Sequence, residues 1–265
     1  MTGWLDTPRS WLDAFGEVAR FGARIIGLIF SGRVLRYFGE SLRQGGILIL
    51  GSAVIIWGFV FILGLQCGLI GAYFSRSIGA PANAGLFAAY CDLREGLPYA
   101  FGYILSAKVG TGIVAELGAM RISDEIDALE VMGIQPVTFL AATRLLGAWI
   151  AIPFLYLVGI GAGYFASYLA VVEQVGDVSA GGYFLIFWTF QDYIDIFFSL
   201  TKAMVMATTI VVVGCYYGYT SSGGPVGVGT ATAKSMAVNI ILVNIIGMLG
   251  TAVFYGPNPR APIGG

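Results

Sequence analysis

Residues 115–136, AELGAMRISDEIDALEVMGIQP, form a short acidic segment between long apolar stretches of the chain. Ser123 is suited to cap the N-terminus of a helix, and Asp124 and Glu125 would then occupy its first turn, where the helix dipole favours negative charge. Gly133 and Pro136 supply a stop signal. The pattern predicts a helix of about nine residues, which is marginal alone in water and needs a surface to dock against.

The predicted helix has two different sides. Apolar and acidic residues each recur at every third position, on opposite faces: Ile126, Leu129 and Met132 against Asp124, Asp127 and Glu130. One interpretation is a docking element for another surface, because no partner within the chain can be identified from the pattern. The other is a solvated loop between two membrane helices.

The composition places most of the remaining chain in lipid. Of the 265 residues, 57% are hydrophobic and 11% are charged, and the mean hydropathy is +0.83. Soluble domains carry about 25% charged residues, and a core of this size cannot hide such an apolar excess. The 39 glycines suit closely packed transmembrane helices. We therefore expect an all-α membrane protein, with residues 1–265 forming one domain.

Several kinds of chemistry are not expected. The chain has no histidine, which excludes histidine-based catalysis and histidine metal sites, and its net charge of −1 gives no sign of nucleic-acid binding. A Walker A motif ending at Lys234 would need glycines where Val228 and Ala233 stand. No ATP site, catalytic residue, metal site or resident cofactor is therefore predicted, and the Arg-rich N-terminus does not resemble a signal peptide.

The three cysteines, Cys67, Cys91 and Cys215, are widely spaced and form no CxxC motif. Buried apolar thiols are the expected state. Whether Cys67 and Cys91 pair is left open.

Residues 9–31 are predicted to form a helix that lies on the membrane. Charged residues fall on one narrow stripe at helical spacing, and apolar residues cover the other faces; the stripe consists of Arg9, Asp13, Glu17, Arg20 and Arg24. An amphipathic helix packed on protein is the alternative. Six arginines before residue 45 indicate a cytoplasmic N-terminus.

Five membrane spans are predicted: residues 46–74, 84–114, 138–172, 194–217 and 235–255. Residues 173–193 contain no Lys or Arg and are placed outside. Residues 218–234 read as a small, flexible loop that returns the chain to the cytoplasmic side. Five spans put the C-terminus outside, although Arg260 in the short tail weakly disagrees.

Charged residues interrupt the second and the fourth of these spans away from their inner ends. Asp92, Arg94 and Glu95 lie in the first half of the 84–114 span, and charges within a membrane usually face a cavity or a partner. Arg94 and Glu95 could pair locally or across a subunit boundary. Alternatively, the span begins at Leu97 and the charges lie in the outer head-group layer.

Lys202 is the charge within the fourth span. It shares one helical face with Asp195 and Ser199. It could meet an anionic lipid head from this position, or snorkel to the outer interface.

The stretch GTGIVAELGAMRISDEIDALEVMGIQPVTFL, residues 110–140, resembles the signature of the MlaE/YrbE permease family. The resemblance extends over about residues 45–255 and includes GGPVGVGTAT at residues 223–232. It implies the membrane subunit of an ABC-type lipid transporter. Its departures are Thr143, where the family usually has proline before the arginine, and the order Gly96-Leu97 before Pro98, which is transposed relative to the family.

The resemblance also implies roles for individual residues. Residues 116–133 would be the cytoplasmic coupling helix between spans two and three, seated on the ATPase through Glu116, Arg121, Asp124, Glu125, Ile126, Asp127, Leu129 and Glu130. The lipid pathway would include Gln66, Arg94, Glu95 and Lys202.

The implied assembly lies in the cytoplasmic, or inner, membrane. It has a second homologous permease protomer that need not be identical, two cytoplasmic ABC ATPase subunits that hold ATP and Mg, and MCE-domain proteins outside. In length and tail the chain is similar to the shorter YrbE permease of actinobacterial Mce lipid importers, and the cargo would be a fatty acid, phospholipid or other long-chain lipid. The exact lipid and the direction of transport stay open.

Two other functions fit a polytopic membrane protein. An ion-coupled secondary transporter would need titratable groups near mid-membrane, which only the second span offers. A lipid-modifying enzyme would need a nucleophile–base pair, and none is seen. Co-purification of an ATPase would separate the three functions.

Overall fold

A computed structural model describes the backbone of residues 8–256 and the side chains of residues 13 and 15–256. Arg9, Trp11 and Leu12 of the predicted charged helix therefore have no described side chains, and the tail with Arg260 lies outside the described residues. Five helical segments within 8–256 are long and apolar enough to cross a membrane, which confirms the predicted all-α fold with five spans: Arg33–Ser77, Pro81–Ile122, Val137–Val175, Tyr193–Tyr219 and Gly224–Tyr255.

Several of these segments combine shorter elements. The first consists of η1 (Arg33–Tyr37) and α2 (Phe38–Ser77), and the second of η2 (Pro81–Asn83), α3 (Ala84–Tyr90), η3 (Cys91–Gly96), α4 (Leu97–Leu105), η4 (Ser106–Gly110) and α5 (Thr111–Ile122). The third consists of η5 (Val137–Ala142), α7 (Thr143–Tyr168) and η6 (Leu169–Val175). The fourth and fifth are α9 (Tyr193–Tyr219) and α10 (Gly224–Tyr255). Elements η1 and η2 are 3₁₀ turns, whereas η3 to η6 are π-helical.

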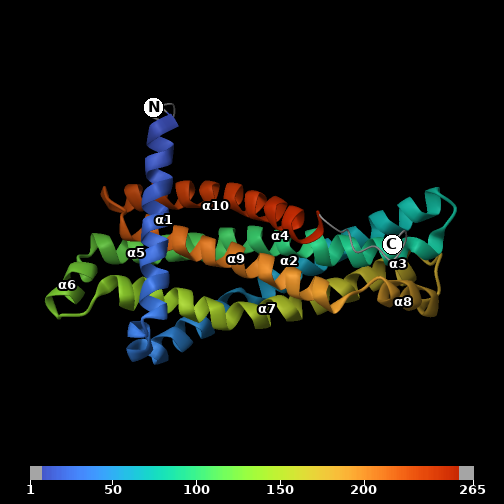
Figure 1. Cartoon of the computed structure of the whole chain (residues 1–265), viewed down its shortest axis with the longest axis horizontal. Coiled ribbons are helices and arrows are strands. Elements are labelled where there is room, and N and C mark those ends of the chain that lie inside the picture. Colours follow the sequence, from blue (N-terminus) through green and yellow to red (C-terminus); the bar gives the residue numbers. More distant parts are fainter. Residues whose placement is uncertain (1–7, 257–265) are drawn as a thin grey trace.

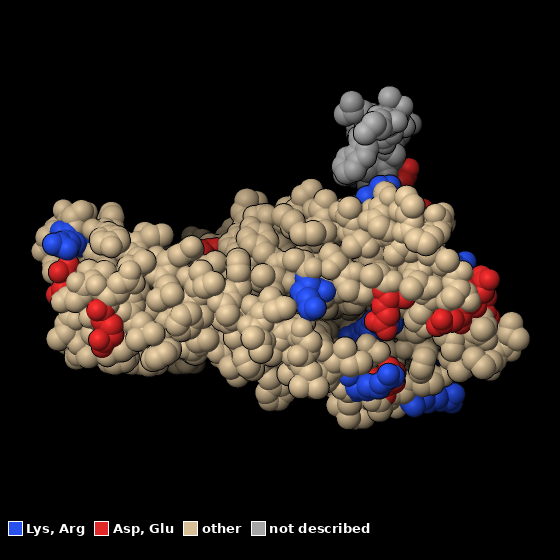
Figure 2. Space-filling model, turned by 180° about the vertical axis from the view of Figure 1, so that it is seen from behind, with Lys and Arg blue, Asp and Glu red and all other residues tan. Residues whose placement is uncertain are grey.

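The long helices run side by side in an elongated bundle (Figure 1). The short helix α6 (Glu125–Val131) lies at one end, and α3 and α8 (Ala180–Thr189) lie at the other. Helix α1 (Pro8–Phe30) crosses the bundle nearly at right angles, near the α6 end. Seen from the other side, charged side chains gather toward the two ends of the bundle, with a largely uncharged belt between them (Figure 2).

Helix α1 has both a packed and an exposed side. Ile25 is fully buried, and the Phe21 ring contacts Tyr216 of α9. Phe15 and Phe30 remain largely exposed. One face of α1 therefore packs on protein, which was the alternative interpretation of the sequence. The other face exposes apolar residues, and its predicted position on the membrane surface stays a prediction.

Glycines set the contact between α2 and α7. Gly64 lies against the backbone of Gly163, and Gly147 against that of Gly45, so closely that neither Gly64 nor Gly147 leaves room for a methyl group. Ser167 extends the contact by donating a 2.8 Å hydrogen bond from its hydroxyl to the Gly64 carbonyl. Small residues allow such close backbone approach in membrane helices, so these glycines have a packing role that their number only suggested.

The prediction of a loop at residues 218–234 is wrong for most of these residues, which are helical. Only residues 220–223 separate α9 from α10. Pro225 lies in the first turn of α10, where its missing N–H is not needed. The hydroxyls of Thr230 and Thr232 donate to carbonyls one turn earlier, and α10 packs on α5. Tertiary packing thus keeps a Gly- and Thr-rich segment helical.

The acidic segment also differs from its prediction. Helix α5 continues to Ile122, so Glu116 and Arg121 belong to the end of a long helix. Ser123 does not cap α6; its hydroxyl donates back to the Ala119 carbonyl, 3.0 Å away. Asp124, in a left-handed conformation, precedes α6 instead. The predicted stop at Gly133 holds, because this residue also adopts the left-handed conformation.

Candidate functional site

The site begins with a break in the helical hydrogen-bond ladder. Pro98 has no N–H and cannot donate to the carbonyl of Arg94, four residues earlier. Two side chains from α9 fill the resulting gap: Lys202 Nζ donates to the Arg94 carbonyl at 2.7 Å, and the Ser199 hydroxyl donates to the Leu93 carbonyl at 2.6 Å. The widened turn η3, which carries Arg94 and Glu95, is therefore held open by α9.

Arg94 is buried in a specific ion pair. Its Nη2 lies 2.8 Å and its Nε 3.1 Å from Oδ2 of Asp195 on α9. The guanidinium also lies over the rings of Tyr90 and Tyr255, 4.0 and 4.5 Å from their centroids. Charge pairing together with ring contacts is an arrangement that Arg favours over Lys. Arg94 thus joins η3 to α9 and α10.

Glu95 has different partners from Arg94: its carboxylate contacts Lys202 and Thr251. The Thr251 hydroxyl lies 2.5 Å from Glu95 Oε1, and Lys202 Nζ lies 2.8 Å from the Thr251 hydroxyl and 3.5 Å from Glu95 Oε2. The Lys202 side chain is 1% exposed and that of Glu95 is 42% exposed. Glu95 is therefore the member of this network with an open side.

These contacts correct two sequence interpretations. Arg94 and Glu95 do not pair locally with each other; each pairs with a residue of α9. Lys202 does not snorkel to a surface, because its ammonium group is buried against three partners. The helical segment extends back to Ala84, and the alternative that the membrane span begins at Leu97 stays untested. The depth of the charges in the membrane stays a prediction.

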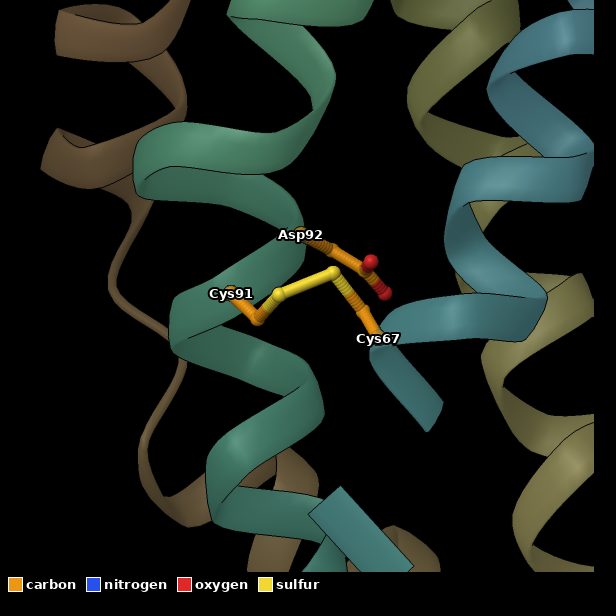
Figure 3. A group of neighbouring side chains, drawn as sticks. All are labelled: Cys67, Cys91 and Asp92. Carbon is orange, nitrogen blue, oxygen red and sulfur yellow. A yellow bond between two sulfur atoms is a disulfide. The ribbon is translucent and has the colours of Figure 1, made fainter. Parts of the chain in front are cut away.

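A second buried group adjoins the network. Asp92 is fully buried, and its Oδ2 forms a very short hydrogen bond with the Ser167 hydroxyl. Cys91 and Asp92 both extend from η3 toward the helix that carries Cys67, as Figure 3 shows. Cys67 and Cys91 form a disulfide, with Cα atoms 5.9 Å apart.

The expectation of buried thiols therefore holds for Cys215 and is wrong for Cys67 and Cys91. The packing of η3 on α2 brings two cysteines 24 positions apart within bonding distance. Cys67, Cys91 and Asp92 cluster closely enough to suggest a metal site, but both sulfurs are bonded to each other. The thiolates that a metal would need are therefore absent.

Gln66, also predicted for the lipid pathway, lies on the exposed side of α2. No hydrogen bond joins its side chain to the charged network in the described chain. The residues missed from sequence are Thr251, which carries no charge, and Ser167. The face formed by Asp195, Ser199 and Lys202 was predicted correctly: all three residues are buried toward η3.

The predicted coupling residues separate into two groups. Ile126 is fully buried in the chain's own core and Leu129 is partly buried, so the expectation that both fill a notch on another subunit is wrong for Ile126. Glu116 pairs with Arg144 at 2.6 Å, and Arg121 with Asp127 at 2.6 Å. The exposed side consists of Asp124, Glu125, Asp127, Ala128, Glu130, Val131 and Met132.

Comparison with known proteins identifies the family. The family model described as "Permease MlaE" matches residues 41–253. The chain belongs to the MlaE permease family. The match includes Arg94, Glu95, Asp195, Lys202 and Thr251 as well as α6, so both parts of the site lie within the family region.

The matches between this MlaE-family permease and individual relatives span different shares of the two chains. A "Probable ABC transporter permease protein" of Rickettsia prowazekii is 33% identical over 162 residues, and the match spans 61% of this chain and 62% of that protein. The "Intermembrane phospholipid transport system permease protein MlaE" of Haemophilus influenzae is 24% identical over 251 residues, 92% of this chain and 94% of its own. "Protein TRIGALACTOSYLDIACYLGLYCEROL 1, chloroplastic" of Arabidopsis thaliana is 26% identical over 181 residues, 67% of this chain and 51% of its own.

Proposed function

We propose that this chain is the membrane subunit of an ABC-type transporter that moves a long-chain lipid across the cell envelope. Membership of the MlaE permease family supports this, as does similarity to a phospholipid transport permease over nearly the whole chain. The chain has no Walker A sequence. ATP and Mg would therefore be held by a separate ATPase subunit, and this chain would bind no cofactor of its own.

The observation that carries the proposed lipid contact is the half-open position of Glu95. Arg94, Asp195 and Lys202 are buried among protein partners, so they fix the network and balance its charge. Glu95 alone among these four charges offers a partly exposed carboxylate, 42% exposed. A lipid head group that passes this point would meet Glu95 first, while Arg94 and Lys202 act as its support.

The proposed ATPase contact lies at the opposite end of the bundle from α8. Val131 is 90% and Met132 is 66% exposed at the end of α6, beside the acidic residues of the same segment. Exposed apolar side chains flanked by one sign of charge suit a protein interface. Movement of the ATPase would enter the bundle here, through α5 and α6.

The orientation proposed from sequence has independent support in the disulfide. Disulfides persist in oxidising compartments and are rare in the cytosol. Cys91, bonded to Cys67, begins η3 directly after α3, and α3 lies at the opposite end of the bundle from α6 (Figure 1). The α8 end would therefore face outward, toward MCE-domain proteins, and the N-terminus and α6 would face the cytoplasm. A second permease protomer would complete the transporter in the inner membrane.

Co-purification followed by reconstitution tests this function. The tagged chain should retain an ATPase through purification, and the complex should transfer phospholipid between vesicles in an ATP-dependent manner. Glu95→Gln should lower transfer by about tenfold, a loss worth about 1.4 kcal/mol, while the ATPase still co-purifies. Glu173→Gln removes a carboxylate that is exposed outside this network and serves as the matched control. The absence of any associated ATPase, or unchanged transfer by Glu95→Gln, would overturn the proposal.

A further inference from the structure

A cavity with both apolar and polar lining lies nearer the α6 end of the bundle than the network around Glu95. It has a volume of about 230 Å³ and opens between α2, η4 and α5, with contributions from α7 and α9. Five polar or charged side chains line it together with apolar residues such as Ile47 and Ile113; the five are Gln44, Ser52, Lys108, Glu116 and Arg144.

Arg144 is a buried lining residue of this cavity, and protein contacts fix its position. Its side chain is 5% exposed, with Nη2 2.6 Å from Glu116 Oε1 and Nη1 2.9 Å from the Leu140 carbonyl. Its buried Nε has no hydrogen-bond partner among the described residues. A buried guanidinium donor without a partner is costly unless a ligand or water satisfies it.

Lys108 adds a positive charge that the surroundings do not neutralise. Glu116 is paired with Arg144, and Glu40, on the neighbouring part of α2, accepts from Arg43 and Gln44. Lys108 forms no ion pair within residues 8–256. It lies in the π-helical turn η4, inside a candidate membrane span. Ionisable groups in such positions usually serve a ligand pathway, and π-helical turns often mark functional sites.

We propose that this cavity binds the phosphate of an anionic phospholipid that enters from the surrounding leaflet. Lys108, whose side chain is exposed, supplies the uncompensated charge, and Arg144 supplies a buried donor. Ile47 is 53% and Leu50 is 88% exposed beside it on α2, where acyl chains can pack. Lys108 follows Glu95 by 13 positions, or about 20 Å along a helix. The cavity is therefore a binding site separate from Glu95. Only a role of this site in transport rests on the proposed function.

The amount of anionic phospholipid that the purified permease retains measures binding in this cavity directly. The full-length permease with its associated subunits is exchanged into phosphatidylcholine nanodiscs with a small fraction of phosphatidylglycerol, and retained phosphatidylglycerol is counted by native mass spectrometry without ATP. Lys108→Gln should weaken retention by about tenfold, because a charge-assisted contact is lost. Lys108→Arg should keep most of it. Lys234→Gln, at an exposed lysine of α10, is the matched control and should match the wild type.

A second variant blocks the cavity without altering charge. Gly112 lines the cavity and has open space where a side chain would extend, so Gly112→Leu should fill it and also reduce retention. If Gly112→Leu does not fold, the Lys108→Gln and Lys108→Arg pair decides.

Wild-type retention by Lys108→Gln would overturn the site, as would equal losses in Lys108→Gln and Lys234→Gln. Displacement by soluble glycerol phosphate at lipid-equivalent concentrations would overturn the lipid as occupant. Retention is counted without ATP and therefore does not depend on transfer, so failure of the transport proposal and failure of this one give different results.

Discussion

The Nζ atom of Lys202 lies 2.7 Å from the carbonyl oxygen of Arg94, the backbone acceptor that Pro98 leaves without its usual helical donor. A lysine side chain thus replaces a backbone N–H inside a membrane-type helix. In lipid no water can satisfy such a carbonyl, so the protein must do so. The proline and the lysine, 104 positions apart in sequence, form one structural device.

Lys202→Met should destabilise the fold. The change leaves the Arg94 carbonyl and the Thr251 hydroxyl without their shared donor, and a buried acceptor left unsatisfied costs about 1–3 kcal/mol. Thermal unfolding of the purified protein in detergent measures the effect. Lys234→Met, which alters an exposed lysine, is the control and should unfold with the wild type. Equal stability of the two variants would contradict a structural role for Lys202.

Loss of the disulfide should lower the thermal stability of the permease. The double alanine substitution and treatment with a reductant should lower it to a similar degree. The bond closes a loop of 24 residues between α2 and η3, and loops of this size correspond to about 3 kcal/mol. Cys67→Ala with Cys91→Ala should unfold earlier than the oxidised wild type. Reductant should lower the wild type toward the variant and leave the variant unchanged. A wild type that does not respond to reductant, with free thiols on mass analysis, would show that the bond does not form.

Gly64→Ala should separate α2 from α7. A methyl group at this position has no room against the Gly163 backbone, and overpacking typically costs about 1–3 kcal/mol. Gly58→Ala is the matched change on the same helix, because nothing lies within 4 Å of an added methyl group there. The comparison of their unfolding temperatures tests the contact, and similar values would mean that the helices are not held this closely.

Substitutions on the two sides of α6 should have different effects. Val131→Ser with Met132→Ser changes exposed residues and should weaken ATPase association by about 1–3 kcal/mol, with the permease still folded. Ile126→Ala removes a fully buried side chain and should instead destabilise the permease, by about 2–5 kcal/mol. Quantified co-purification and thermal unfolding of both variants separate binding from folding. Wild-type ATPase recovery with the double serine variant would mean that this tip is not the contact.

The spans were predictable because their apolar runs are long and nearly free of charge. The buried face of Asp195, Ser199 and Lys202 was predictable because helical spacing alone aligns them. Their partners were not, since Arg94 and Asp195 are 101 positions apart and only the packing of α9 on η3 brings them together.

The errors have a common physical origin in tertiary context. The apolar side of a short helix looks the same whether it faces its own chain or another subunit, and in α6 Ile126 faces its own chain. Similarly, the Gly- and Thr-rich start of α10 has weak helix propensity, and its contact with α5 outweighs that weakness. Composition also could not identify Cys67 and Cys91 as neighbours.

The glycine contacts between α2 and α7 have a mechanical consequence. They recur from Gly45 to Gly64 and continue at Gly68 against Ser167, so they extend over 23 residues, or about 35 Å of helix. Interlocked backbones resist sliding past each other, because any axial shift would drive a carbonyl into the opposite chain. A force applied at the α6 end would therefore tilt the two helices together as a stiff lever. Relative motion within the protomer would then be left to α10, whose apolar stretch is mostly unburied.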